Sequence, residues 1–578
     1  MNFKELWQDS VQNQKNICIS LLILLSILLI CIIVLASVPP ISRDALTHHL
    51  FVPKLYIEHG GIYEIPTIPF SYYPMNLDLF YMIPLYFSND IIPKYIHFLF
   101  ALLTGGLIFQ YLNRRTNIKY ALLGCLFFLS IPIIVKLSIT VYVDLGLMFF
   151  TTASLLLIFR WLNSGYKLRY LFFAGIFCGL AAGTKYNGLI TIFLLPLFIP
   201  VVYLRSHSGV QGSNTKSIGF AILFVLATLL AFSPWLIRNY TWTGNPIYPL
   251  HNSLFQLAHD KAIVQEQPQQ ENPTEILKKI TSRGSNVFAT RKILYNETWS
   301  QSLLLPVRFF FEGQDDNPRY FDGRLNPFLL LLPCFAFLKK SPTRSLQLEK
   351  YTLLTFSLCF FFFTFFQESL RIRYIVCIVP PLVLLSICGL QNIFSTISKI
   401  RQCWPHRSAI FLGLAVLTAM LSYNAHYIAQ QFQTIQPLSY IRGTTTREQY
   451  ITRFRPEYPV IQYANEHLDS DSTVLCVFLG NRGYYMNFKP IFDMPFSKGV
   501  LKDILDLKVS ENSLKTGLLK QGITHILLRD DLTLNWYQQL SASDQAEVNS
   551  FFQNSIEKLI SSGGYSFFNI ISNVISTH

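Results

Sequence analysis

The sequence lacks the motifs that mark several large classes of protein. No glycine-rich loop ending in Gly-Lys-Ser or Gly-Lys-Thr occurs, which argues against a nucleotide-driven pump. No C-x-x-C spacing and no convincing internal repeat is present, so the usual cysteine metal and redox motifs are excluded. Of the ten cysteines, only Cys476 falls in the C-terminal part that we expect outside the membrane, so no intramolecular disulfide can form there.

Apolar residues, in contrast, are abundant. They make up 51% of the chain, with 49 Phe and a mean hydropathy of +0.35, which exceeds what the core of a soluble domain requires. The composition therefore predicts a polytopic α-helical membrane protein. Since a helix needs roughly 20 apolar residues to cross a bilayer, we predict about eleven transmembrane helices. They fall at residues 17–38, 96–112, 120–135, 145–161, 171–183, 189–204, 218–237, 325–338, 351–366, 374–393 and 409–427.

Lys and Arg gather in alternate loops, and this pattern predicts the orientation. If the N-terminus is cytoplasmic, the inside loops hold most of the basic residues, as the positive-inside rule requires. We therefore expect a multi-pass protein of the cytoplasmic membrane with a periplasmic or extracellular C-terminal domain. Much of the net charge of +14 is accounted for by these loops rather than by a basic face, so nucleic acid is not an expected partner. The first span lacks a cleavage site before Pro39 and is expected to remain as an anchor.

Three outer segments are long enough to carry function: 39–95, 238–324 and 430–578. In the first, the spacing predicts a helix after Asp44 and a second short helix over 74–87, both beside the membrane. The second contains a Gln/Glu/Pro run at 265–274 that predicts a mobile loop. In the third, helical patterns at 460–467 and 515–521 alternate with strand patterns at 472–478 and 524–528. The sequence therefore predicts a catalytic membrane module over 1–428 and an α/β domain over 429–578.

Asp44 is the best candidate for a catalytic group. It follows the first span on the predicted outer side, where partial desolvation would raise the proton affinity of a carboxylate and suit a general base. Alternatively, Asp44 and Ser42 cap the helix that follows. His48 lies one turn after Asp44, so a divalent metal is possible, although no third ligand stands at a firm spacing and no metal residue is assigned.

Asp144 and Lys185 are isolated charges at the predicted outer ends of spans. Asp144 would cap the fourth span by default. Lys185 occupies a very short turn between the fifth and sixth spans, where an ionisable group should have a partner. We interpret Asp144, Lys185 and His48 as supporting or acceptor-orienting groups.

Three arginines lie on the same predicted side: Arg238 at the end of the seventh span, and Arg371 and Arg373 before the tenth. Guanidinium groups bind phosphate through two parallel hydrogen bonds. The alternative is that these side chains reach toward lipid headgroups, as arginines at span ends do. Such arginines are expected mainly on the inside, so the outer position favours binding of a lipid phosphate.

Four stretches together resemble the C-type glycosyltransferases, which use polyprenyl-phosphate sugars and include protein O-mannosyltransferases, the lipid A aminoarabinose transferase and bacterial family-39-like enzymes. They are RDALTHHL at 43–50, GLAAGTKY at 179–186, SPWLIRNYTWTGNP at 233–246, and Arg373-Tyr374 with Pro380-Pro381. The resemblance covers about 1–427 in layout, and the C-terminal segment looks like the outer domain of some members. It implies inverting transfer of a sugar, with Asp44 matching the base. The protein mannosyltransferases have Asp-Glu there, whereas Ala45 follows Asp44 here.

The resulting hypothesis is transfer of a sugar from a polyprenyl-phosphate carrier to a hydroxyl of a glycan, lipid or protein acceptor at the outer membrane face. Two other functions remain open. A lipid or glycan transporter or flippase would also have many spans, but it should carry ionisable residues near mid-span, and few occur there. A non-catalytic envelope scaffold would tolerate replacement of Asp44 and the arginines together.

Overall fold

The computed structural model describes residues 3–206, 213–253, 255, 287–365, 370–397, 405–495, 499–507 and 513–571. These residues form two compact units. The first unit contains 1–36, 72–80 and 92–436, and the second contains 37–71, 81–91 and 437–578. The structure thus groups most of the first predicted outer segment with the C-terminal residues rather than with the spans. The predicted loop at 265–274 lies outside the described residues.

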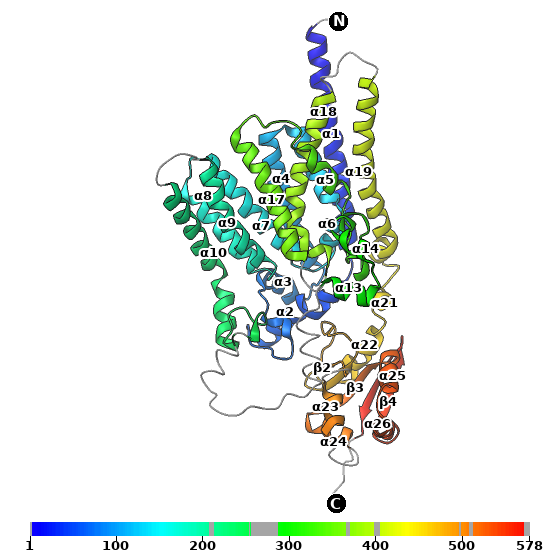
Figure 1. Ribbon diagram of the computed structural model, residues 1–578. Helices are drawn as coiled ribbons and strands as arrows, with labels where there is room; N and C mark the ends of the chain where they lie inside the picture. Colours follow the sequence, from blue (N-terminus) through cyan, green and yellow to red (C-terminus); the bar gives the residue numbers. More distant parts are fainter. Residues whose placement is uncertain are drawn as a thin grey trace, which may run out of the picture. The chain divides into compact units, whose positions relative to one another are not determined.

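The first unit is a bundle of apolar helices (Figure 1). Eight described helices are long and apolar enough to cross a membrane, or nine if the bent pair α5–α6 is one span. The long helices are α1 (Phe3–Ala36), α4 (Ile92–Arg115), α7 (Asp144–Asn163), α9 (Gly188–Ser206), α10 (Ser213–Thr243), α17 (Arg344–Phe365), α18 (Val379–Ile397), which the short helix η4 (Ile372–Ile378) precedes, and α19 (Pro405–Ile435). The predicted class, a polytopic helical membrane protein with a C-terminal α/β region, is confirmed.

The difference from about eleven predicted spans has a local cause. Each predicted stretch contains a helix, but α8 (Leu168–Ala182) has 15 residues and α16 (Phe328–Phe335) has 8, so both are too short to qualify on length. The third stretch bends by 65° between α5 (Ile118–Ser130) and α6 (Pro132–Ser138). Pro132 explains this bend, because the residue before a proline is pushed out of the helical region, and Ile131 has φ −56° and ψ 131°.

Helices α8 and α10 pack closely because α8 carries glycine on the contact face. A Cβ atom on Gly175 would lie 2.6 Å from the carbonyl oxygen of Phe224, and one on Gly179 would lie 2.3 Å from that of Thr228. The Thr228 hydroxyl donates a hydrogen bond to the Gly175 carbonyl (3.1 Å). This is the small-residue spacing that lets transmembrane helix backbones approach each other.

The second unit contains a five-stranded sheet with the order β2-β1-β3-β5-β4. Strand β1 (Thr473–Val477) pairs in parallel with β2 (Lys489–Asp493) and β3 (Ile523–Arg529), whereas β5 (Tyr565–Ile570) is antiparallel to β3 and β4 (Ile556–Ser562). Both faces of β1 are covered: Leu475 and Val477 belong to one apolar cluster, and Val474 and Cys476 belong to another. The remaining helices of this unit are α2 (Phe51–His59), α20 (Pro437–Ile441), α21 (Arg447–Phe454), α22 (Tyr458–His467), α23 (Val500–Leu507), α24 (Ser513–Lys520), α25 (Asp530–Gln538) and α26 (Ala542–Asn554).

The secondary structure predicted for the two outer segments is confirmed where the structure describes it. The expected helix over 74–87 is α3 (Asn76–Tyr86), and the two helix-then-strand repeats correspond to α22–β1 and α24–β3. Strands β2, β4 and β5 were not predicted. Strands β2 and β4 form the two edges of the sheet and are only partly buried, so their sequences lack a continuous apolar run.

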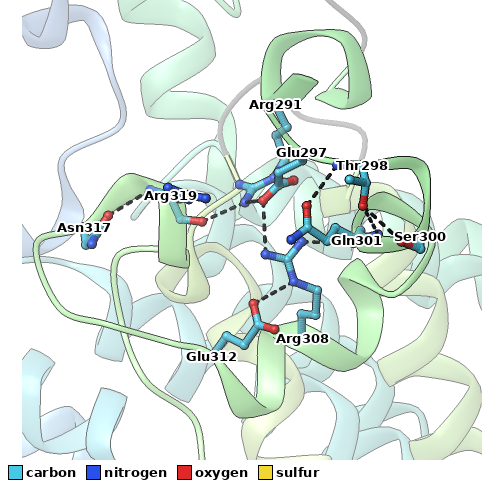
Figure 2. Close-up of polar contacts among 9 residues, drawn as sticks. All are labelled: Arg291, Glu297, Thr298, Ser300, Gln301, Arg308, Glu312, Asn317 and Arg319. Atoms are coloured by element: carbon cyan, nitrogen blue, oxygen red, sulfur yellow. Dashed lines mark hydrogen bonds and ion pairs between the residues drawn. The ribbon is translucent and has the colours of Figure 1, made fainter. Parts of the chain in front are cut away.

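A buried group of ion pairs holds residues 287–324 of the first unit together (Figure 2). Glu297, whose side chain is 1% exposed, accepts two hydrogen bonds from Arg291 (2.8 and 2.7 Å) and one from Arg308 (3.1 Å). Both guanidinium groups also lie over the ring of Phe321. The carbonyl of Phe321 accepts a hydrogen bond from the Ile372 amide (2.8 Å), so this group of charges fixes the start of η4. This segment includes α13 (Val287–Tyr295), α14 (Trp299–Leu303), α15 (Leu305–Phe311) and η3 (Pro318–Tyr320).

We expect Glu297→Gln to destabilise this segment strongly. The change leaves Arg291 and Arg308 buried without their shared carboxylate, and breaking a buried pair costs about 3–5 kcal/mol. The measurement is thermal unfolding of the purified protein. Glu312→Gln is the matched control, because Glu312 pairs with Arg308 but its side chain is 40% exposed, so its loss should cost about 0–1 kcal/mol. Equal melting temperatures for the two variants would contradict this assignment.

Acidification should narrow the stability difference between wild type and Glu297→Gln. Burial raises the pKa of Glu297, but hydrogen bonds and charge from Arg291 and Arg308 outweigh burial, so the pKa lies below its ordinary value. The pairing therefore stabilises the folded protein at neutral pH. This stabilisation is lost as the pH falls below the ordinary glutamate value and through the lowered one.

Candidate active site

Asp144 and Lys185 form an ion pair at the N-terminal end of α7. The Lys185 Nζ lies 2.7 Å from Asp144 Oδ1; the Asp144 side chain is fully buried, and that of Lys185 is 18% exposed. Asp144 is the first residue of α7, with Val143 at the N-cap position. Its negative charge is therefore also stabilised by the positive end of the helix dipole. The sequence predicted a partner for Lys185, and the structure shows that this partner is Asp144.

His97 of α4 binds a free backbone amide at the N-terminal end of α7. Its Nε2 accepts a hydrogen bond from the Leu145 amide (3.0 Å), and its Nδ1 lies 2.9 Å from the Leu137 carbonyl and 3.0 Å from that of Thr140. Because Nε2 accepts, the ring proton is on Nδ1, and the imidazole is neutral. His97 is fully buried, and its charge-free form caps α7 beside Asp144.

Arg373 of η4 contributes a second cation near Asp144. Its guanidinium lies 4.9 Å from the centre of the Tyr142 ring and 5.4 Å from that of Tyr374, and the residue is buried. The Lys185 ammonium also lies over the Tyr374 ring, 5.2 Å from its centre. The charges of Lys185 and Arg373 both stabilise ionised Asp144.

Asp322 joins Arg371 to this cluster. It lies 3.5 Å from Arg371 and 3.2 Å from Lys136, which also pairs with Asp315 and Asp316. Burial raises the pKa of Asp322, but the charges of Lys136, Arg373 and Arg371 outweigh burial and hold the pKa below its ordinary value. Asp322 therefore stays ionised at neutral pH. Lys185, Arg371 and Arg373 thus share two carboxylates, Asp144 and Asp322. We call these five residues the charge cluster.

Arg238 lies in the same unit and contacts backbone carbonyls and aromatic rings there, and its role in binding a lipid phosphate stays a prediction. Its Nη2 donates to the carbonyls of Tyr72 (2.7 Å) and Tyr73 (3.2 Å), and its guanidinium lies between the rings of Trp235 and Trp242, 4.4 and 4.8 Å from their centres. These contacts fix the turn before α3. The neighbouring Asn239 strengthens the turn by donating to the Tyr72 carbonyl and the Tyr186 hydroxyl, each at 2.9 Å.

Asp44 and His48 belong to the second unit. Asp44 precedes η1 (Ala45–His49), a π-helical turn in which the Leu50 amide donates to the Ala45 carbonyl (2.9 Å). The Asp44 side chain makes no capping hydrogen bond to this turn, so the alternative of a simple helix cap is not what the geometry shows. Single π-helical turns occur frequently at functional sites. His48 stacks on Phe70, with ring centres 4.5 Å apart.

The helical segment after Asp44 is held by a loop of the C-terminal residues in the same unit. The Tyr484 amide donates to the Leu46 carbonyl (3.1 Å), and the Lys54 ammonium donates to the carbonyls of Met486 (2.6 Å) and Tyr484 (3.2 Å). Gly483 lies directly against Phe51: a Cβ atom there would be 2.4 Å from the ring. The backbone of η1 and α2 is therefore fixed by residues more than 400 positions away.

Of the predicted site residues, the structure brings together Asp144, Lys185, Arg371 and Arg373, places Arg238 in the same unit, and places Asp44 and His48 in the other. Within the described residues, no group of three His, Cys, Asp or Glu side chains is arranged to hold a metal ion, so the possible divalent metal stays a prediction. Sequence reasoning missed His97 and Asp322. The isolated Lys136 at a span end was a signal for an acidic partner such as Asp322, but His97 carries no comparable signal.

Comparisons with known proteins agree with this architecture. Residues 89–237 match the family described as dolichyl-phosphate-mannose-protein mannosyltransferase. A search of curated proteins gave no match. Among solved structures, ArnT from Cupriavidus metallidurans bound to undecaprenyl phosphate has a TM-score of 0.55 and 12% identity, over 96% of this chain and 98% of that one. AglB from Archaeoglobus fulgidus, in complex with an inhibitory peptide and a dolichol-phosphate, has a TM-score of 0.50 and 14% identity, over 96% and 75%.

At these identities the structural likeness establishes the fold, and the family match over residues 89–237 points to the same class of enzyme. The fold is that of the C-type glycosyltransferases, and both comparisons agree with the glycosyltransferase class that the sequence predicted.

Proposed function

We propose that this protein is an inverting glycosyltransferase that moves a sugar from a polyprenyl-phosphate carrier to an acceptor hydroxyl. The observation that carries the proposal is the charge cluster, in which three cations share two carboxylates beside apolar helices. The guanidinium groups of Arg371 and Arg373 suit a phosphate group, and the apolar helices suit its lipid tail. The undecaprenyl phosphate bound to ArnT and the dolichol-phosphate bound to AglB support this class of donor.

In the proposed reaction, Asp44 removes the proton from the acceptor hydroxyl as its oxygen attacks the anomeric carbon. The bond between that carbon and the phosphate oxygen breaks, and the lipid phosphate leaves with the bonding electrons. Arg371, Arg373 and Lys185 stabilise the charge that develops on the phosphate. Asp144 and Asp322 hold these cations in place, and Arg238 fixes the turn before α3. In this proposal the N-terminus is cytoplasmic, and the reaction occurs at the outer face of the inner membrane.

The test of the proposal is Asp44→Asn, assayed with purified protein and a panel of radiolabelled polyprenyl-phosphate sugars. A positioned base contributes about 10²–10⁴-fold, so we expect kcat to fall by that factor while donor binding is retained. Glu58→Gln is the matched control, because Glu58 lies on the adjoining helix α2 and its side chain is 54% exposed. Turnover close to wild type for Asp44→Asn would remove Asp44 from this role.

The same assay separates the proposal from the two alternatives. An enzyme releases the unglycosylated polyprenyl phosphate. A transporter or flippase moves the labelled lipid across reconstituted vesicles with the sugar still attached, and a scaffold does neither.

We expect Asp144 and Lys185 to act as one unit. Replacing Asp144 by Asn leaves the buried end of Lys185 without its counter-charge, and Lys185→Gln removes the cation itself, so each change should lower kcat/KM. The double variant should be no worse than Lys185→Gln alone. The measurement is a double-mutant cycle in kcat/KM, with an expected coupling of about 0.5–3 kcal/mol. Strictly additive effects would show that Asp144 acts independently of Lys185.

Arg371 should depend on its geometry as well as its charge. Arg371→Lys keeps the charge but loses the planar pair of donors, so we expect a higher KM for the lipid donor and little change in thermal stability. Arg319→Gln is the control, since Arg319 is exposed and contributes to the Glu297 ion pairs only through its backbone carbonyl. An unchanged KM in Arg371→Lys would assign phosphate binding to other residues.

A further inference from the structure

A cavity of about 470 Å³ lies between α4 and α7 at their C-terminal ends. Its lining runs along α4 from Leu107 to Arg115 and along α7 from Phe149 to Asn163, with Phe177 of α8 at one side. Sixteen residues separate Asp144 from Arg160, which corresponds to about 24 Å along a helix. The cavity is therefore distinct from the charge cluster, and it has the size of a ligand site.

The walls of this cavity are divided by polarity. The apolar part consists of Leu107, Phe149, Leu156, Leu157 and Phe177. Helices α4 and α7, which carry the first four, are candidate membrane spans, and α8, which carries Phe177, is a shorter apolar helix. Three arginines, Arg114, Arg115 and Arg160, stand in the last turns of α4 and α7. An occupant must therefore present an apolar chain and a polar head at once.

A buried carboxylate organises the polar end. Glu349 of α17, whose side chain is fully buried, pairs with Arg115 and accepts hydrogen bonds from Tyr111 (2.8 Å) and Asn163 (2.7 Å). These contacts fix Arg115 in the wall and neutralise its charge. An arginine at a helix end that only extends toward water does not need a buried carboxylate partner. The buried Glu349 therefore indicates that the polar end of the cavity has a defined geometry.

The other two arginines leave the cavity positively charged. Within the part of the chain that the structure describes, Arg114 has no hydrogen-bond or ion-pair partner. Arg160 has no carboxylate partner among the described residues; it donates a hydrogen bond to the Tyr170 hydroxyl and lies 5.1 Å from the centre of the Tyr170 ring. Guanidinium groups bind phosphate through charge-assisted hydrogen bonds. The occupant should therefore carry a negative charge where these two side chains meet the cavity.

We propose that this cavity binds one molecule of an anionic phospholipid. The phosphate is held by Arg114 and Arg160, and one acyl chain lies along the apolar wall between α4, α7 and Phe177. Scattered basic residues at a membrane surface attract many anionic lipids weakly and without fixed number. A cavity predicts one lipid that is retained when the surrounding lipids are removed. The proposal does not depend on the glycosyl-transfer reaction.

The test is native mass spectrometry of the full chain, purified from vesicles of phosphatidylcholine alone or of phosphatidylcholine mixed with phosphatidylglycerol. We expect wild type to retain one phosphatidylglycerol and no phosphatidylcholine. Arg114→Glu should lower this retention at least about tenfold, because it reverses a charge at the site. Arg114 is exposed and has no partner to lose, so the variant should fold, and thermal unfolding verifies this.

Lys167→Glu is the matched control. It makes the same change of charge in the turn between α7 and α8, but Lys167 is exposed and does not line the cavity. Equal retention by Arg114→Glu and wild type would overturn the proposal, as would an equal loss in Lys167→Glu, which indicates nonspecific attraction. Glycerol phosphate, added as a soluble competitor, should not displace the lipid. Displacement would assign the site to free phosphate instead.

Discussion

A buried charge at the end of an apolar helix needs a partner of opposite charge. The ion pair between Asp144 and Lys185 meets this need at the start of α7, and the rest of the charge cluster depends on it. Asp144 is fully buried, and an ionised carboxylate there would be unstable without a partner. Lys185 supplies that partner from a turn between two other helices. Because each charge needs the other, the pair fixes the turn after α8 against the start of α7. Arg373 adds its charge from a third element, so the three segments converge on one carboxylate.

A second group of buried charges helps to position the arginines of the charge cluster. Glu297 holds Arg291 and Arg308 against Phe321, and the Phe321 carbonyl binds the amide of Ile372, between Arg371 and Arg373. Asp322 follows Phe321 directly and pairs with Arg371. A chain of contacts thus runs from an ion-pair core to the two guanidinium groups. Such support restricts the arginines to a defined geometry, which matters more for binding a phosphate than the charge alone.

A buried carboxylate with basic partners lies near each end of α7: Asp144 at the N-terminal end and Glu349 near the C-terminal end. At one end, Asp144 compensates cations that we assign to the lipid phosphate of the donor. At the other, Glu349 compensates one arginine and leaves two others for a phospholipid. In both, a buried acid organises basic residues beside an apolar surface. The difference lies in the surroundings: rings of Tyr142 and Tyr374 line the first, whereas an open apolar cavity adjoins the second.

Local sequence patterns determined the class of fold and most of its elements. Apolar runs predicted the helices of the membrane unit, and alternating patterns predicted α22, β1, α24 and β3, because burial leaves its mark on neighbouring residues. At α8 and α16 the apolar pattern is longer than the helix, so these two elements fall below the length of the other membrane-span candidates. The sequence patterns missed the edge strands β2 and β4, which are only partly buried.

The site was predictable only in part. The isolated position of Lys185 predicted that it has a partner, since an ionisable group among apolar helices requires one, and the structure shows Asp144 in that role. The pairing of Arg371 with Asp322, the capping of α7 by His97 and the use of Arg238 to bind backbone carbonyls were decided by the tertiary structure alone. Each joins residues far apart in the chain. Their distances depend on how whole helices pack, and no short stretch of sequence encodes that.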